Sequence, residues 1–387
     1  MNPIPYGKQA LSQADIDAVV EVLKSDYWTQ GPRVAAFEKA FADYIGCTYA
    51  VAVANGTAAL HLCALALGVD AQTNVITTPI TFAASANCIR YCGGTVFFAD
   101  IDPESYLIDI DKVRALINNK PPGFFKGIIP VDFAGNAVNL EAFKKLADEF
   151  GLWIIEDACH APGGYFTDSE NKRQHCGNGQ FADLAIFSFH PVKHIACGEG
   201  GMITTNDEGL YKKLLQLRTH GITKDPEQMK ENHGGWYMEM QMLGYNYRIP
   251  DVLCALGISQ LGRAAAGLQR RHEIADRYTA ALSELPVKLP EYDKGHGFHL
   301  YVIHTPKRKE LYDYLRTRNI FTQVHYIPAH LMPYYRSLGW KKGDFPLAEA
   351  YYEGCLSLPM YPTLTEEEQQ YVVDAIKTFF TGESTTG

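Results

Sequence analysis

Between residues 50 and 156, short apolar runs alternate with segments whose apolar residues recur at helical spacing. The strand-like runs lie at 50–54, 74–78, 95–101, 127–133 and 152–156, and the helical segments lie at 58–67, 82–91, 110–117 and 140–150. Strands separated by helices require crossover connections, which build parallel sheets buried on both faces. The pattern therefore predicts an α/β fold with a mostly parallel central sheet.

The second half of the chain has a different organisation. Residues 220–248 are rich in His, Gly, Asn and Tyr and break the alternation, residues 249–285 are largely helical, and residues 297–380 mix strands and helices. A loop as long as 220–248 is often functional or lies at an interface. We predict a large domain at 1–250 and a smaller α+β domain at 251–387.

The overall charge and the cysteine pattern exclude several classes of function. The 387 residues carry a formal net charge of −9 without a block of basic residues, which argues against nucleic acid or an anionic membrane as partner. The nine cysteines show no CxxC pair and no signal peptide or membrane span is seen, so we expect a cytoplasmic protein with reduced thiols. The spacing of Cys159, His160, His175 and Cys176 matches no common zinc pattern, and we expect no metal.

Lys193 lies in a setting unlike that of a surface lysine. A strand-like run at 182–189 precedes it, and Gly198-Glu199-Gly200-Gly201 and a second apolar run follow it. A lysine between two buried strands is partly desolvated, which lowers its pKa and favours the neutral amine that a Schiff base needs. A lone lysine more often reaches out to solvent from a loop, so the interpretation depends on partners elsewhere.

Three other positions supply such partners. Asp157 follows the strand 152–156 and lies where parallel sheets bind ligands, although an aspartate there also caps helices. The turn Asn55-Gly56-Thr57 between a strand and a helix offers free N–H groups to a phosphate, and the hydroxyl of Ser188 could join them. Phe82 could stack on a cofactor ring or belong to the core.

The order of these motifs resembles the DegT/StrS family of pyridoxal phosphate (PLP)-dependent sugar aminotransferases. That resemblance implies the type I (aspartate aminotransferase-like) fold, with a mostly parallel seven-stranded sheet in the large domain, and a homodimer with shared active sites. The similar motifs run almost from end to end: Gly31-Pro32 with Phe37-Glu38, residues 55–60, Thr81-Phe82, residues 156–161, Ser188-Phe189, Lys193, residues 198–201 and residues 244–248.

The resemblance also implies roles for individual residues. Lys193 and Asp157 become the catalytic residues, with Lys193 joined to PLP as a Schiff base and Asp157 paired with the pyridine nitrogen. The other cofactor contacts are implied to be Gly56, Thr57 and Ser188 on the phosphate, Phe82 on the ring, His160 near the ring hydroxyl, and Asn246 reaching the phosphate of the partner subunit.

Within the family the chain is similar to the PseC-like branch, on the strength of residues 187–190, residues 323–328 and Tyr6. That branch uses L-glutamate to aminate carbon 4 of a UDP-linked N-acetylated 4-keto-6-deoxy sugar, toward pseudaminic acid. Tyr6, His325 and Tyr326 are then expected to bind the substrate.

Other activities stay open at this stage. They are another nucleotide-sugar 3- or 4-aminotransferase acting on a dTDP- or GDP-linked sugar, a PLP- or PMP-dependent sugar dehydratase with histidine in place of the lysine, and a non-catalytic PLP-binding regulator. A Rossmann oxidoreductase is disfavoured because no G-x-G-x-x-G follows the first strand.

Overall fold

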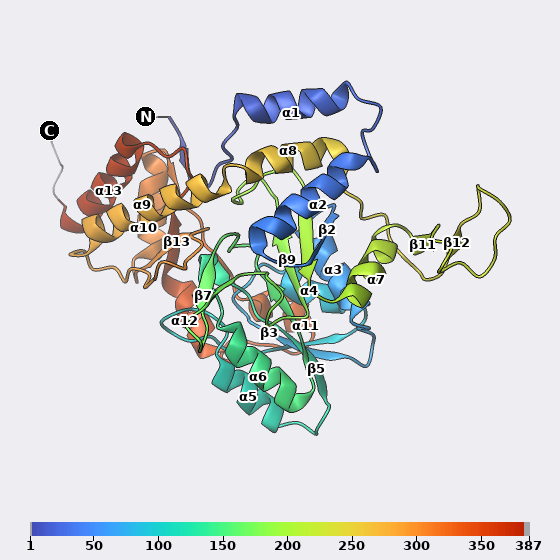
Figure 1. Ribbon diagram of the computed structural model, residues 1–387. Helices are drawn as coiled ribbons and strands as arrows, with labels where there is room; N and C mark the ends of the chain where they lie inside the picture. Colours follow the sequence, from blue (N-terminus) through green and yellow to red (C-terminus); the bar gives the residue numbers. More distant parts are fainter. Residues whose placement is uncertain (1, 383–387) are drawn as a thin grey trace.

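A seven-stranded sheet forms the centre of the molecule in the computed structural model, which describes residues 2–382 (Figure 1). The strand order is β2-β10-β9-β6-β5-β3-β4, and only β10 runs antiparallel to its two neighbours. The strands are β2 (Tyr49–Val53), β3 (Asn74–Thr77), β4 (Thr95–Phe98), β5 (Phe125–Ile129), β6 (Trp153–Asp157), β9 (Leu184–Ser188) and β10 (Gly201–Thr205). The prediction of a mostly parallel seven-stranded sheet is confirmed.

Four helices between these strands lie close to the predicted positions. They are α3 (Gly56–Ala66), α4 (Ala84–Tyr91), α5 (Ile110–Asn118) and α6 (Leu140–Phe150), and a further helix, α7 (Glu208–Arg218), follows β10. The predicted start of α4 at Phe82 is two residues early, because Phe82 lies in the preceding loop and is 62% exposed. The predicted strand 127–133 is too long at its end, since a 3-10 turn forms at Phe133–Gly135.

Two N-terminal helices pack on α8 (Asp251–Leu261), as Figure 1 shows. The first, α1 (Gln13–Leu23), begins with a capping box formed by Ser12 and Asp15. The second, α2 (Pro32–Ile45), is tied to α8 by the buried carboxylate of Asp251, which accepts the N–H groups of Gly31 and Arg33, each at 2.8 Å. This carboxylate therefore fixes the start of α2 against the rest of the large domain.

The C-terminal part follows α9 (Ala264–Leu282). Its elements are β13 (Tyr301–His304), α10 (Arg308–Thr317), β14 (Ile320–Phe321), α11 (Pro333–Ser337), α12 (Pro346–Gly354), β15 (Cys355–Leu358) and α13 (Glu366–Thr381). Regular strand pairing of β14 ends at Phe321, and one isolated bridge joins Gln323 to Ser357. The domain boundary at residue 250 stays a prediction.

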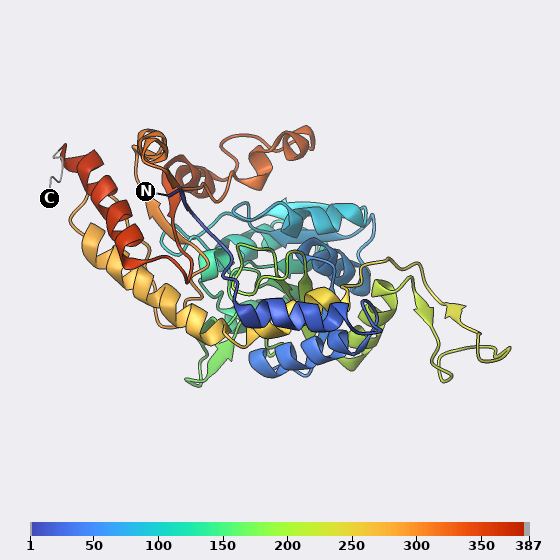
Figure 2. The ribbon, with the colours of Figure 1, turned by 90° about the horizontal axis from the view of Figure 1, so that it is seen from above.

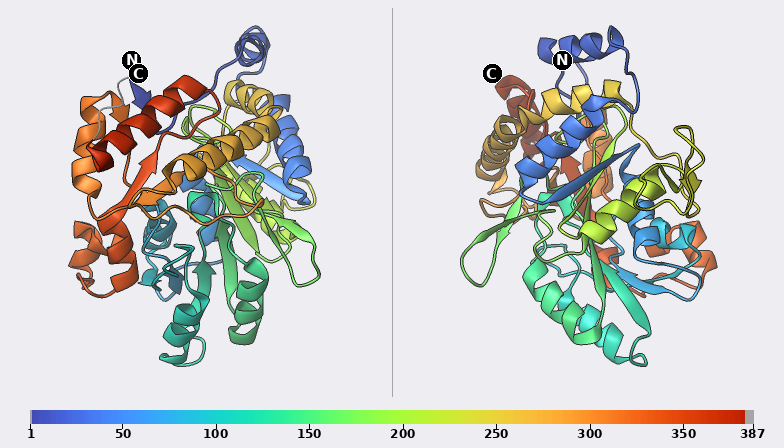
Figure 3. Two further views of the ribbon diagram at one scale, coloured as in Figure 1. Left: turned by 90° about the vertical axis from the view of Figure 1, so that its left-hand side faces the viewer. Right: turned by 45° about the vertical axis from the view of Figure 1, so that its right-hand side comes forward.

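The N-terminal strand β1 (Ile4–Pro5) crosses to this C-terminal part and pairs in parallel with β14. Figures 2 and 3 show this segment running from α1 to the C-terminal helices. The residues that follow β1 are thereby held near the junction between the large sheet and the C-terminal part.

The irregular stretch 220–248 forms an arm that stands away from the body (Figures 1 and 2). It contains the small hairpin of β11 (Ile222–Thr223) and β12 (Glu239–Met240), and Trp236 and Leu243 are 77% and 73% exposed. A second hairpin, β7 (Tyr165–Thr167) with β8 (Arg173–His175), lies between β6 and β9 in the chain.

The nine cysteines are free thiols. Across residues 2–382, no helix combines the length and the apolar character that crossing a bilayer requires.

The link between Asp251 and the start of α2 can be tested by substitution. Asp251→Ala removes the acceptor of two buried N–H groups, and we expect a loss of about 3 kcal/mol in the free energy of unfolding. Asp251→Asn keeps one carbonyl oxygen and should lose less. Urea unfolding followed by circular dichroism measures both, and equal stability of the alanine variant and the parent would contradict this role.

Candidate active site

A pocket of about 870 Å³ opens at the carboxyl ends of β6 and β9, beside the N-terminus of α3. Its volume is in the range typical of small-molecule sites. It brings together ten of the eleven predicted site residues, which are Tyr6, Gly56, Thr57, Phe82, Asp157, His160, Ser188, Lys193, His325 and Tyr326.

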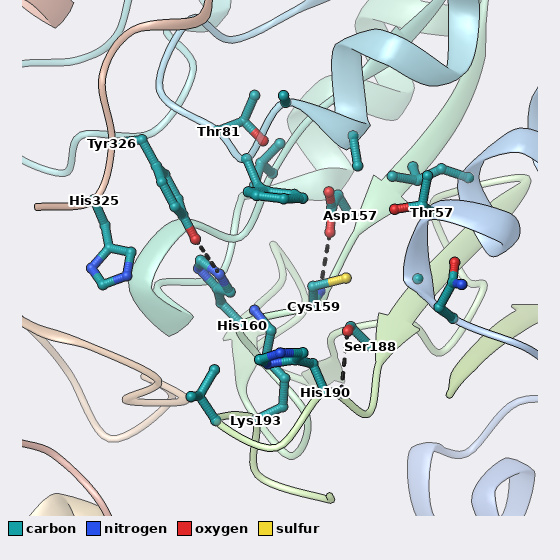
Figure 4. Close-up of a pocket in the computed structure, with 18 of the residues that line it drawn as sticks. Thr57, Thr81, Asp157, Cys159, His160, Ser188, His190, Lys193, His325 and Tyr326 are labelled. Atoms are coloured by element: carbon teal, nitrogen blue, oxygen red, sulfur yellow. Dashed lines mark hydrogen bonds between the residues drawn. The ribbon is translucent and has the colours of Figure 1, made fainter. Parts of the chain in front are cut away.

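Lys193 enters this pocket from the loop that follows β9. A turn closed by its N–H and the carbonyl of His190, 2.8 Å apart, sets its backbone, and Figure 4 shows the side chain directed into the cavity near His160. Desolvation lowers the pKa of the Lys193 amine, against the smaller opposing effects of Cys159 and Asp157. The neutral amine is therefore more accessible here than in an exposed lysine.

The neighbouring residue, His194, is held differently. Its Nε2 lies 2.6 Å from the carbonyl oxygen of Gly297, and among the described residues it is Lys193 rather than His194 that lines the pocket. Of these two neighbours, Lys193 is the one whose side chain faces the pocket.

Asp157 ends β6 with its carboxylate facing the pocket. One oxygen accepts a hydrogen bond from the hydroxyl of Ser85 at 2.6 Å, and the other accepts the N–H of Cys159 at 3.2 Å (Figure 4). Both bonds fix the orientation of the carboxylate at the end of β6. The sequence reasoning missed Ser85, because it lies in the first turn of α4, 72 residues from its partner.

The start of α3 is shaped to receive an anion. Asn55 caps the helix by accepting the N–H of Ala58 at 2.8 Å, and the N–H groups of Gly56 and Thr57 have no acceptor within the helix. A Cβ on Gly56 would lie 3.0 Å from the Cβ of Ser188, so glycine keeps this cradle open. Free N–H groups at a helix N-terminus fit a phosphate.

His160 and Tyr326 form a hydrogen-bonded pair in the pocket (Figure 4). The N–H of Ala134 donates to Nδ1 of His160 at 3.2 Å, so the neutral ring carries its proton on Nε2, which faces the Tyr326 hydroxyl oxygen at 3.2 Å. Burial lowers the pKa of His160 and raises that of Tyr326. Tyr326 therefore stays protonated and can donate its own hydrogen toward a ligand. The contact predicted between His160 and the ring hydroxyl stays a prediction.

Tyr6 and His325 lie against each other at another wall of the pocket. Their ring centroids are 5.0 Å apart, and the β1–β14 pairing places Tyr6 there. His325 is fixed by a hydrogen bond between Nδ1 and the Ser357 hydroxyl at 2.8 Å, and burial lowers its pKa to about 3. His325 is therefore neutral at physiological pH.

Asn246 is the one predicted residue that the fold does not bring into this pocket. It is exposed near the base of the arm, in a bridge with Thr219, and is not among the described residues that line the cavity of its own chain. Its predicted contact with the phosphate of a partner subunit requires such a position and stays a prediction.

The four residues considered as zinc ligands do not form one cluster in the described part of the chain. Only Cys176 belongs to a group of neighbouring ligand atoms, and its partners there are Asp132 and Glu156. Burial raises the pKa of Asp132 to about 7 and that of Glu156 well above its usual range. Glu156 accepts the N–H of Gly177 with both oxygens at 2.9 Å.

Comparison with known proteins gives consistent matches. The family model for the DegT/DnrJ/EryC1/StrS aminotransferase family matches residues 9–377. The chain is 37% identical to the spore coat polysaccharide biosynthesis protein SpsC of Bacillus subtilis, covering 98% of this chain and 97% of that one. It is also 37% identical to the UDP-4-amino-4,6-dideoxy-N-acetyl-beta-L-altrosamine transaminase of Campylobacter jejuni, covering 96% of each.

Solved structures are similar over the same length. Helicobacter pylori PseC, an aminotransferase involved in the biosynthesis of pseudoaminic acid, superposes with a TM-score of 0.88 at 31% identity, over 99% of this chain and 100% of that one. NtdA from Bacillus subtilis with bound cofactor PMP gives a TM-score of 0.83 at 28% identity, over 96% and 83%.

The lowered pKa of Lys193 gives a direct test of the site. Because burial disfavours the ammonium form, the free amine exists at lower pH than in exposed lysines. In the full-length chain freed of small molecules, the pH midpoint of acetic anhydride labelling at Lys193, followed by mass spectrometry, should lie below that of the exposed lysines. A midpoint equal to theirs would show that the amine is solvated.

Proposed function

The chain belongs to the DegT/DnrJ/EryC1/StrS aminotransferase family, and we propose that it moves the amino group of L-glutamate to the C4 ketone of a UDP-linked N-acetylated 4-keto-6-deoxy sugar. It is a sugar aminotransferase with the type I PLP-dependent transferase fold, and its cofactor is PLP. The observation that carries the proposal is one pocket that joins a desolvated lysine amine, a carboxylate at a strand end and an open helix N-terminus. The names of the Campylobacter and Helicobacter proteins support the choice of sugar.

The residues present fit the cofactor. The N–H groups at the start of α3, with the Ser188 hydroxyl, would hold its phosphate in the cradle that Gly56 leaves open. Phe82, exposed at the pocket, would cover the ring, and Asp157 would pair with the ring nitrogen. When bound, PLP supplies an aldehyde that carries the amino group and a ring that withdraws electrons from the reacting carbon.

Lys193 and Tyr326 provide the proton chemistry that this chain contributes. The neutral Lys193 amine can take a proton from the donor's α-carbon and later return it, acting first as general base and then as general acid. Tyr326, which keeps its proton because burial raises its pKa, can donate a hydrogen bond to an oxygen of the sugar. Tyr6 and His325 complete the proposed substrate wall.

A homodimer with shared sites follows from the same proposal. Asn246 is exposed and lies outside its own pocket, at the base of an arm whose Trp236 and Leu243 are exposed. Apolar side chains on a projecting arm are typical of a surface that another chain covers. We therefore propose that Asn246 contacts the cofactor phosphate bound by the partner subunit.

The sugar dehydratase is disfavoured as an alternative. In that class histidine replaces the lysine, whereas here His194 is bonded to Gly297 and Lys193 lines the pocket. A non-catalytic regulator would bind PLP without turnover, which the following assay distinguishes. A cytoplasmic location stays a prediction.

The proposed substrate is tested with a panel of keto sugars. Purified enzyme with glutamate should aminate a UDP-linked N-acetylated 4-keto-6-deoxy sugar with a higher kcat/KM than its dTDP- or GDP-linked counterparts, as measured by product mass and NMR. Preference for a dTDP- or GDP-linked sugar, or amination at C3, would contradict the proposed substrate. Absence of turnover with every sugar of the panel would contradict the proposed aminotransferase activity.

Asp157 should matter for turnover more than for cofactor binding. Asp157→Asn keeps the size of the side chain but removes its charge, and we expect kcat to fall by roughly 100- to 1000-fold with PLP still bound, by absorbance. Ser85→Ala removes one of the two hydrogen bonds to Asp157 and should reduce kcat less. An Asp157→Asn enzyme with parental kcat would contradict the ring-nitrogen role.

Mixed dimers test the shared site. Lys193→Ala and Asn246→Ala subunits should each be nearly inactive alone. When they are unfolded and refolded together, some dimers acquire one site with both residues intact, and we expect about a quarter of parental activity at equal mixing if subunits pair at random. No recovery in mixtures that form dimers would argue against a contribution from Asn246 across the interface.

A further inference from the structure

His299 lies against the amine of Lys193 and has no role in the reaction described so far. Nε2 of His299 lies 3.5 Å from the Lys193 amine nitrogen. The His299 ring centroid is 4.3 Å from that of His160 and 5.8 Å from that of His194. His299 lines the pocket and is almost fully buried.

We propose that His299 is a positioning residue that holds the free amine of Lys193 in the pocket while this amine is not joined to the cofactor. The inference rests on the proposed function. During each half of an amino transfer the amine is released and has to act on a carbon nearby, and a flexible lysine side chain without a hydrogen-bond partner would sample several rotamers.

The backbone around His299 is held by many contacts. The buried Arg271 donates from Nη1 to the carbonyl oxygens of Phe298 at 3.1 Å, His299 at 3.3 Å and Met360 at 3.0 Å. The N–H of Phe298 donates to Nδ1 of His296 at 2.9 Å, and Phe298 has a φ of +45°. A segment fixed in this way presents the His299 ring at a defined position.

The titratable groups that face Lys193 come from several elements. Asp157 and Cys159 lie at the end of β6, His160 follows them, Arg271 lies on α9 and His325 follows β14. Burial, followed by the Lys193 charge, keeps the pKa of His299 well below its usual range. His299 is therefore neutral and has one ring nitrogen with a free electron pair.

A neutral His299 can accept a hydrogen bond both from the free amine of Lys193 and from its protonated ammonium form. In the tautomer of His299 with its proton on Nδ1, the free amine of Lys193 can donate one N–H to Nε2 and keep its own electron pair for the reacting carbon. When the amine takes a proton from that carbon, a third N–H bond forms and the bond to His299 remains, now from an ammonium group. Such a charge-assisted bond stabilises the protonated form.

Three variants distinguish whether His299 positions the Lys193 amine by a hydrogen bond or only packs against it. His299→Phe keeps an aromatic ring but removes the acceptor, and His299→Gln keeps an acceptor near the position of Nε2. His296→Asn is the control, because His296 is a buried histidine in the same segment that does not line the active pocket, and the asparagine oxygen can keep the bond from the Phe298 N–H.

The first measurement needs no turnover. In the full-length chain without cofactor, acetic anhydride labelling of Lys193 should reach its midpoint at lower pH in His299→Phe than in the parent, because the protonated amine loses its acceptor. His299→Gln should lie nearer the parent, and His296→Asn, which keeps the bond from Phe298, should leave the midpoint unchanged.

The second measurement uses the PLP-loaded enzyme. We expect kcat of His299→Phe to fall by roughly 10- to 100-fold with KM for the sugar unchanged, and His299→Gln to recover part of this loss. An unchanged labelling midpoint in His299→Phe, or full kcat in His299→Phe combined with low kcat in His299→Gln, would overturn the proposal in favour of packing alone. If the parent aminates no sugar, the proposed function fails, whereas the labelling midpoint still decides the role of His299.

Discussion

The amine of Lys193 lies where its charged form is disfavoured, and most of the architecture around it serves to keep it there. The loop after β9 carries the side chain inward, the carboxyl end of β6 supplies Asp157, and the C-terminal part supplies His299. Desolvation alone would leave a buried amine without partners, which is costly. Neutral histidines and one nearby carboxylate offer hydrogen bonds and compensating charge without restoring bulk water.

A similar principle governs the polar groups deeper in the site. His160, His299 and His325 are neutral because burial lowers their pKa, so each ring has one donor nitrogen and one acceptor nitrogen. The tautomer of His160 follows from a single backbone N–H, that of Ala134, and it determines which way the Tyr326 hydroxyl can donate. Specific directions of hydrogen bonding in the pocket are thus set by groups that no ligand touches.

The parts of the fold that were predicted correctly are those whose pattern lies within a short stretch of the sequence. The alternating strands and helices, the turn at Asn55-Gly56-Thr57, and Lys193 before a glycine-rich stretch each depend on residues within a few positions of one another. Ser85 and His299 have no such signal, because their partners are 72 and 106 residues away. The apolar residues around Phe82 predict that a helix starts there. In the structure Phe82 lies in the loop before α4, where it lines the pocket and is not part of the core.

The pairing of β1 with β14 has a mechanical consequence. Tyr6 directly follows β1, its ring packs on His325, and the N–H of Met360 binds its carbonyl oxygen at 2.9 Å. Tyr6 is therefore tied to the C-terminal part beside His325 and Tyr326, although it lies more than 300 positions before them in the chain. Any hinge displacement of the C-terminal part relative to the central sheet would shift these three side chains in concert, while Asp157 and the start of α3 stayed in place.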